Sequence, residues 1–172
     1  MAAPVFYRER LNTPTGPILI VTDAEQRLRA IEWTDHEQRM HQLLRQQYGT
    51  VGISDAAAPS PARRSLQAYF EGDMAALAGL AVATNGTAFQ QEVWEALRRI
   101  PVGRTVSYSG LAAAIGRPTA TRAVGLANAT NPVPIVIPCH RVIGADGTLT
   151  GFGGGLDRKR WLLAHEGARL LH

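Results

Sequence analysis

The spacing of apolar residues changes near residue 86, and this change limits the folds that the chain can adopt. Before it, short apolar runs alternate with turns that contain Pro and Gly, a pattern typical of an antiparallel sheet. After it, apolar residues recur every three or four positions, as on amphipathic helices. We therefore expect an α+β chain of two domains, an N-terminal α/β domain over residues 1–85 and a mainly helical domain over residues 86–172.

Three strands and two helices are predicted in the N-terminal part. The strands are VFYRERL (5–11), PILIVT (17–22) and LRAIEW (28–33). Turn-forming segments separate them, so they should pair as neighbours in an antiparallel sheet. A helix is expected over residues 35–49 and another over residues 62–72, each with apolar residues along one face. The residues between them, 51–62, are expected to form a loop.

A capping motif marks the first helix of the C-terminal part. The side chains of Thr87 and Gln90 are spaced to satisfy each other's amide, as in a capping box, and Pro101 should end the helix. Ser109 is expected to begin a second short helix, and residues 119–130 a third. Two short helices joined by a turn with glycine are typical of a helix-turn-helix, whose second helix lies against DNA. Two packed core helices are the alternative interpretation.

The single cysteine follows a short apolar segment. VPIVIP (133–138) is interpreted as a buried strand that ends at Cys139. A glycine-rich turn and loop over residues 142–155 and a last helix over residues 156–167 complete the chain.

Composition narrows the classes of function. One cysteine excludes an internal disulfide and favours a reducing compartment. No apolar run reaches the length of a membrane span and the N-terminus lacks a signal-peptide core, so we expect a cytoplasmic protein without a membrane partner. Residues 1–86 carry 8 basic and 9 acidic side chains, whereas residues 87–172 carry 10 and 5. The basic half favours a nucleic-acid partner, although a basic half-chain that is only well solvated is the alternative.

Cys139 and His140 could form a nucleophile and its base. A cysteine is mostly protonated at neutral pH, and an imidazole oriented by a carboxylate can take its proton. Adjacent side chains often point apart, so a water could link the two. Glu166, near the end of the last helix, and Asn131, just before the apolar segment, are the candidate orienting groups. On this local pattern alone, an inert buried cysteine is the more common case.

The wider frame around this cysteine resembles the O6-alkylguanine-DNA alkyltransferase family, bacterial type. The segments that carry the resemblance are IPCHRVIG (137–144), NPVPIV (131–136), LLAHEG (162–167), GTAFQQEVWEALRRIPVGRTVSY (86–108) and ATRAVGLANATNP (120–132). They occur in the family's order and at its spacing. The resemblance implies a ribonuclease H-like N-terminal domain with an antiparallel sheet, and a C-terminal helix-turn-helix or winged-helix-like domain.

The resemblance also implies a reaction, the direct reversal of DNA damage. Cys139 would take the alkyl group from O6-alkylguanine, and from O4-alkylthymine, in a single irreversible turnover. His140 would act as base through a water, with Glu166 polarising it. Asn131 would hold the turn near the cysteine. Tyr108 would protonate the leaving guanine, because guanine leaves more easily when the negative charge that develops on it is neutralised by a proton.

The remaining implied roles concern DNA and the alkyl pocket. Arg122 would enter the base stack in place of a flipped nucleotide, because O6 faces inward in a duplex. The other residues expected to contact DNA are Thr121, Ala123, Gly125, Ser109 and Arg117. The residues expected to line the alkyl pocket are Pro134, Val142, Phe152 and Gly153.

Two departures from the family pattern modify these expectations. Phe152 and Gly153 stand where relatives often have Tyr and Ser, so we expect the glycine-rich loop to admit alkyl groups larger than methyl. The N-terminal part lacks the cysteines of the zinc site that some relatives carry, so no metal and no cofactor are expected. The expected partner is double-stranded DNA containing O6-alkylguanine, bound by a protein that is monomeric in solution and could bind DNA cooperatively. A DNA-binding alkylation sensor without repair chemistry and a cysteine hydrolase are the alternatives.

Overall fold

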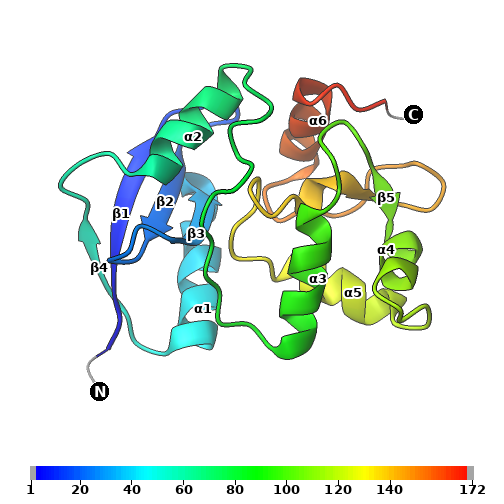
Figure 1. Cartoon of the computed structure of the whole chain (residues 1–172), viewed down its shortest axis with the longest axis horizontal. Helices are drawn as coiled ribbons and strands as arrows, with labels where there is room; N and C mark the ends of the chain where they lie inside the picture. The colour runs from blue at the N-terminus through cyan, green and yellow to red at the C-terminus, as the bar shows by residue number, and fades with distance from the viewer. Residues whose placement is uncertain (1–2, 170–172) are drawn as a thin grey trace. The chain divides into compact units, whose positions relative to one another are not determined.

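The structure is a computed structural model that describes residues 3–169 of the chain (Figure 1). It divides into two compact units, Met1–Asn85 and Gly86–His172. Among the described residues, the first unit contains a four-stranded sheet with two α-helices, and the second contains four α-helices and a two-stranded sheet. The predicted α+β class is therefore confirmed.

A four-stranded sheet forms the centre of the first unit. Its strands are β1 (Val5–Leu11), β2 (Ile18–Thr22), β3 (Leu28–Trp33) and β4 (Gly52–Asp55), in the spatial order β3-β2-β1-β4. The first three pair antiparallel where the sequence predicted strands, whereas β4 pairs parallel with β1. The loop predicted over residues 51–62 is therefore wrong at its start. β4 has only four residues, mostly exposed, so no apolar alternation marks it in the sequence.

Helices cover both faces of this sheet. They are the 3-10 helix η1 (Thr34–His36), α1 (Glu37–Tyr48) and α2 (Pro61–Phe70). On β1, Phe6 packs in one apolar cluster with Met40 of α1. Glu9, three positions further along β1, accepts hydrogen bonds from the amide and hydroxyl of Ser60, the N-cap of α2. Because successive strand residues face opposite sides, α1 and α2 lie on opposite faces of the sheet.

The second unit is mainly helical. Its elements are α3 (Ala88–Arg98), β5 (Val106–Ser107), α4 (Tyr108–Ala114), α5 (Thr121–Ala129), the 3-10 helix η2 (Cys139–Arg141), β6 (Val142–Ile143) and α6 (Leu156–His165). The capping box predicted before α3 is confirmed, because Thr87 and Gln90 each accept a hydrogen bond from the other's amide. The predicted start of α4 at Ser109 is wrong: the hydroxyl of Ser107 caps this helix by accepting from the Gly110 amide at 2.9 Å.

Two hydrogen bonds fix α5 against α3. The indole nitrogen of Trp94 donates to the carbonyl oxygen of Ala127 (2.8 Å), and the side-chain amide of Gln90 donates to the hydroxyl of Thr130 (3.2 Å). α4 packs against both helices. Together these contacts give α5 a defined position within the second unit, with Thr130 and Asn131 directly after it in the chain.

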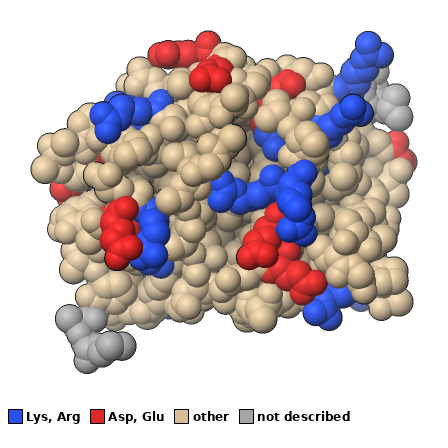
Figure 2. All heavy atoms as spheres, in the orientation of Figure 1, with Lys and Arg blue, Asp and Glu red and all other residues tan. Residues whose placement is uncertain are grey.

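Charged side chains lie in separate groups on the face of the molecule drawn in Figure 2, and several basic groups there adjoin acidic ones. The ion pairs of the structure include Arg8 with Asp55 (3.0 Å) and Arg117 with Glu92 (3.1 Å). Within residues 3–169, no helix is both long enough and apolar enough to cross a membrane.

Candidate functional site around Cys139

Cys139 follows a buried turn and not the strand predicted over residues 133–138. All six of these residues are buried, but none is in a strand, and residues 133–137 form bends and turns. Ile135 has a φ of 76°, in the left-handed region that β-branched residues rarely adopt. The strand prediction failed because a short run of buried apolar residues fits a strand and a buried turn equally well.

Asn131 holds this turn with its side chain. Its amide nitrogen donates to the carbonyl oxygen of Ile137 (2.8 Å), and its side-chain oxygen accepts from the amide of Val133 (2.9 Å). Asn131 is itself only 1% exposed. The side chain of Asn131 therefore supplies hydrogen bonds to this backbone that a neighbouring strand would supply in a sheet.

Cys139 begins η2 and is 5% exposed. Its thiol is not part of a disulfide. Burial in apolar surroundings keeps a thiol protonated, and only a thiolate is a good nucleophile. The ionisable groups packed around Cys139 therefore decide whether it is reactive.

A buried network joins His140, Arg141 and Glu166. The Nε2 atom of His140 donates to Oε2 of Glu166 (2.8 Å). Arg141 donates from Nε to Oε1 (2.8 Å) and from Nη2 to Oε2 (3.0 Å) of the same carboxylate. Arg141 also donates to the carbonyl oxygen of Ile100 (2.7 Å). The side chains of His140 and Glu166 have no exposed surface, so this network is shielded from solvent.

The network keeps Glu166 charged and His140 neutral. Burial raises the pKa of Glu166, but the hydrogen bonds and charges of His140 and Arg141 outweigh it and lower the pKa from 4.5 to about 2. For His140 burial dominates and lowers the pKa below 6.5, against the opposing effect of Glu166. The negative charge of Glu166 favours a protonated His140. Burial and the positive charge of Arg141 act against protonation, so the imidazole stays neutral.

The tautomer of His140 follows from these contacts. Because Nε2 carries the proton that is donated to Glu166, Nδ1 must carry the lone pair. Within the part of the chain that the structure describes, this buried Nδ1 has no hydrogen-bond partner. A buried polar atom without a partner is rare and is often a site for a bound water or a reactive group.

Lys159 is a functional candidate that the sequence analysis missed. It lies on α6 and is 0% exposed, and its amine donates to the carbonyl oxygen of Thr150 (2.9 Å). Burial lowers its pKa from 10.5 to about 8, and the negative charge of a Cys139 thiolate acts in the opposite direction. Helical spacing was the available signal, because Lys159 falls three, four and seven residues before Leu162, Leu163 and Glu166, all of which are buried.

Tyr108 also contacts Thr150, the loop residue to which Lys159 is hydrogen-bonded. It is the first residue of α4 and is half-buried, and its hydroxyl accepts a hydrogen bond from the Thr150 hydroxyl (3.1 Å). Thr150 therefore connects Tyr108, through its side chain, with Lys159, through its backbone. This places Tyr108 and Lys159 around one point of the loop that follows η2.

The residues predicted on α5 are accessible. Arg122 and Ala123 are exposed, and Thr121 and Gly125 are half-buried. Ser109 on α4 is exposed as well. A DNA backbone could therefore reach each of these positions.

Arg117 differs from these residues because its guanidinium is already paired with a carboxylate. It donates to Glu92 (3.1 Å), and its guanidinium lies 5.6 Å from the centre of the Phe89 ring. An Arg117–phosphate contact would have to compete with this ion pair, which weakens the case for a role in DNA binding.

The four predicted pocket residues do not share one environment. Pro134 and Val142 are buried, and Val142 pairs with Val106 between β6 and β5. Phe152 is half-buried and Gly153 is exposed. The loop residues thus differ from the buried pair in their exposure, and a pocket shared by all four stays a prediction.

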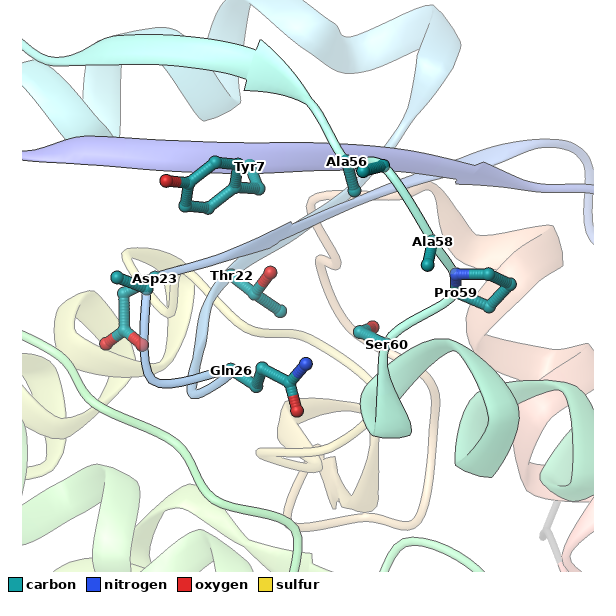
Figure 3. Close-up of a pocket in the computed structure, with 10 residues that line it drawn as sticks. Tyr7, Thr22, Asp23, Gln26, Ala56, Ala58, Pro59 and Ser60 are labelled. Atoms are coloured by element: carbon teal, nitrogen blue, oxygen red, sulfur yellow. The ribbon is translucent and has the colours of Figure 1, made fainter.

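A separate pocket of about 290 Å³ lies in the first unit (Figure 3). Tyr7, Thr22, Gln26 and Ser60 are among its lining residues, and none of the predicted site residues contributes to it. Within the described residues, no group of three or more His, Cys, Asp or Glu side chains is placed to hold a metal ion.

Comparison with known proteins gives the same relatives for both units. Residues 6–84 match the family described as "6-O-methylguanine DNA methyltransferase, ribonuclease-like domain", and residues 88–168 match the "DNA binding domain" of the same description. The methylated-DNA–protein-cysteine methyltransferase of Salmonella typhimurium is 53% identical over 165 residues, which cover 95% of this chain and 96% of that protein. The protein of the same name from Mycobacterium tuberculosis is 43% identical over 167 residues, 96% of this chain and 94% of that protein.

The structural comparison agrees. The crystal structure of Mycobacterium tuberculosis OGT in complex with DNA superposes with a TM-score of 0.79 at 40% identity, covering 95% of this chain and 92% of that one. The crystal structure of the O6-methylguanine methyltransferase of the same organism gives a TM-score of 0.76 at 39% identity, covering 94% of this chain and 93% of that one.

Proposed function

This chain belongs to the 6-O-methylguanine DNA methyltransferase family, as the motifs around Cys139 predicted, and from this premise we propose how its own residues carry out the reaction. Its function is direct-reversal DNA repair, in which an alkyl group passes from O6 of guanine in DNA to a cysteine of the enzyme, once per molecule. We propose Cys139 as the acceptor, because it is the only cysteine in the sequence.

The observation that carries the proposal is the unpartnered, buried Nδ1 of His140. A water bound there would accept the proton of the Cys139 thiol and pass it to Nδ1, while Nε2 remains bonded to Glu166. The sulfur would then attack the alkyl carbon, the bond from that carbon to O6 would break, and the electron pair would stay on guanine. Glu166 would stabilise the imidazolium that forms, without taking a proton itself, whereas the positive charge of Arg141 opposes it.

Lys159 would favour the thiolate by its charge. Its pKa of about 8 leaves the amine mostly protonated at neutral pH. An ammonium group near a buried sulfur lowers the cost of the anion. Through Thr150, Lys159 would also hold the loop against Tyr108, which we propose as the proton donor to the leaving guanine.

Burial of Cys139 requires that the target base leave the duplex. With 5% of its surface exposed, the residue cannot reach an atom inside a base stack. We propose that Arg122 fills the vacated position. Within the described residues its side chain has no hydrogen bond or ion pair to give up, and it lies at the start of α5. Thr121, Ala123, Gly125 and Ser109 would contact the DNA beside it.

The finer features of the activity are also proposals. We propose that O6-alkylguanine is the preferred lesion with O4-alkylthymine as a second substrate, that the protein acts in the cytoplasm as a monomer, and that Pro134, Val142, Phe152 and Gly153 line the alkyl pocket. Neither the sensor without chemistry nor the cysteine hydrolase is favoured, because the relatives that match along almost the whole chain are named as methyltransferases.

Intact-protein mass spectrometry tests the proposal. The protein is incubated with duplex DNA that contains one O6-methylguanine. We expect the intact protein to gain the mass of one methylene stoichiometrically, with no turnover beyond one per molecule, and peptide mapping after digestion to place the gain on Cys139. Cys139→Ser should bind the duplex and gain no mass. Methylation of the Ser variant, or repeated turnover by the unmodified protein, would refute Cys139 as a single-use acceptor.

A further inference from the structure

The exposed face of α5 carries an apolar side chain that the fold does not require. Leu126 is 67% exposed, more than any other large apolar residue in residues 3–169. Arg122, Ala123, Leu126 and Ala129 are all exposed, and their spacing places them on one face of the helix. Folding does not explain a leucine here, because the residues of α5 that face the core are Val124, Ala127 and Asn128.

The exposed face of α5 combines a positive charge with an apolar side chain, which suits a ligand that has both negative charges and apolar surface. Arg122 is its only charged residue, and no acidic side chain occurs anywhere in α5. The helix lies within the residues that match a DNA-binding domain. A DNA groove combines phosphates at its edges with the carbon-rich surfaces of sugars and bases within it, and proteins use leucine, among other apolar residues, against these surfaces.

We propose that Leu126 packs against the apolar surface inside a DNA groove and so seats α5 beside the lesion. This rests on the proposed function and adds a residue to it. Four residues advance a helix by about 6 Å, so Leu126 would lie one turn beyond Arg122 on the same side. Arg122 would fill the gap in the base stack, and Leu126 would hold the helix against the neighbouring nucleotides.

Substitution of Leu126 by Ala tests this without endangering the fold, since Ala is the strongest helix former and the position is exposed. Binding to a duplex with one O6-methylguanine is measured in the Cys139→Ser background, where no transfer occurs. We expect Leu126→Ala to weaken binding by about tenfold, equivalent to 1.4 kcal/mol. Leu126→Gln, which keeps the length but not the apolar character, should weaken it similarly. Leu156→Ala is the matched control, because Leu156 is another exposed leucine of the same unit (43%) and lies on α6.

Two further readouts identify the cause of the loss. The dependence of binding on salt should keep its slope in Leu126→Ala, because an apolar contact releases no counterions. With Cys139 present, transfer from free O6-benzylguanine base should be unchanged, whereas transfer from the duplex should slow at subsaturating protein concentrations.

Several results would overturn the proposal. They are unchanged duplex binding by Leu126→Ala, an equal loss in Leu156→Ala, and a shallower salt slope. An equal loss with the free base would also overturn it, because it would indicate a disturbed active site. Failure of the proposed function would look different, because the unmodified protein would then transfer no alkyl group from duplex or free base.

Discussion

Replacing Glu166 by Gln removes one negative charge from the buried network but keeps its size and its acceptor for His140. Arg141 would then be a buried cation with no carboxylate. The pKa of Glu166 falls from 4.5 to about 2 on folding. At 1.36 kcal/mol for each pKa unit, ionised Glu166 contributes about 3 kcal/mol to the free energy of unfolding. Measured costs of breaking buried ion pairs are about 3–5 kcal/mol, which agrees.

The contribution of Glu166 to the free energy of unfolding depends on pH. A carboxyl whose pKa is lowered by folding stabilises the protein fully above its unfolded pKa. That contribution is lost as the pH falls from about 4.5 towards 2. Glu166→Gln lacks this contribution at every pH. The difference in stability between the two proteins should therefore be about 3 kcal/mol at pH 7 and should disappear near pH 2.

The assay must report on the second unit alone, because the two units need not unfold together. Hydrogen exchange of peptides from residues 86–172, measured across a urea series, meets this need. The control is Glu92→Gln, which removes a partly exposed carboxylate paired with Arg117. It should cost less than about 1 kcal/mol. Equal losses in the two variants, or a loss in Glu166→Gln that persists at pH 2, would refute the assignment of a buried, ionised Glu166.

Three other results are expected. Lys159→Met should leave the fold at least as stable, because it removes a buried amine, but should slow transfer by about tenfold, because the Cys139 thiolate loses a neighbouring positive charge; a transfer rate equal to that of the unmodified protein would exclude the electrostatic role. Thr87→Ala should lower the free energy of unfolding by about 1 kcal/mol through loss of the capping box, measured by the same hydrogen exchange across a urea series, with Thr119→Ala as an exposed control outside any helix. Transfer of a benzyl group from O6-benzylguanine should be detectable by mass, because we expect the glycine-rich loop at Phe152 and Gly153 to admit alkyl groups larger than methyl; complete inertness would contradict this expectation.

Local patterns sufficed for much of the fold. The strands of residues 5–11, 17–22 and 28–33 alternate with turn signals, and the cap at Thr87 has a side-chain signature that needs no tertiary information. β4 could not be predicted in this way, because its parallel pairing with β1 joins residues that are distant in the chain. Such pairing depends on the surrounding fold and not on the four residues themselves.

The candidate site divides in a similar way. Cys139 and His140 are neighbours in the sequence, so their pairing could be proposed directly. Glu166 could be named as a candidate from its place at the end of the last helix, but 26 residues separate it from His140, so its role came from the family resemblance. Lys159 and Thr150 were missed, since a lysine among arginines on a helix is usually solvated, and only packing shows that this one is buried.

The backbone of Ile135 has a consequence for protein engineering. Stabilising a protein by consensus or helix- and strand-favouring substitutions assumes that each residue suits its own backbone conformation. At Ile135 the φ of 76° would suit Gly or Asn better. A scheme that matches residue types to backbone conformation would therefore recommend replacing this isoleucine. The replacement would relax the turn that Asn131 holds and would leave a gap in the core. Thermal stability and acceptor reactivity should therefore be selected separately at this position, because a change that improves the backbone can displace the thiol four residues later.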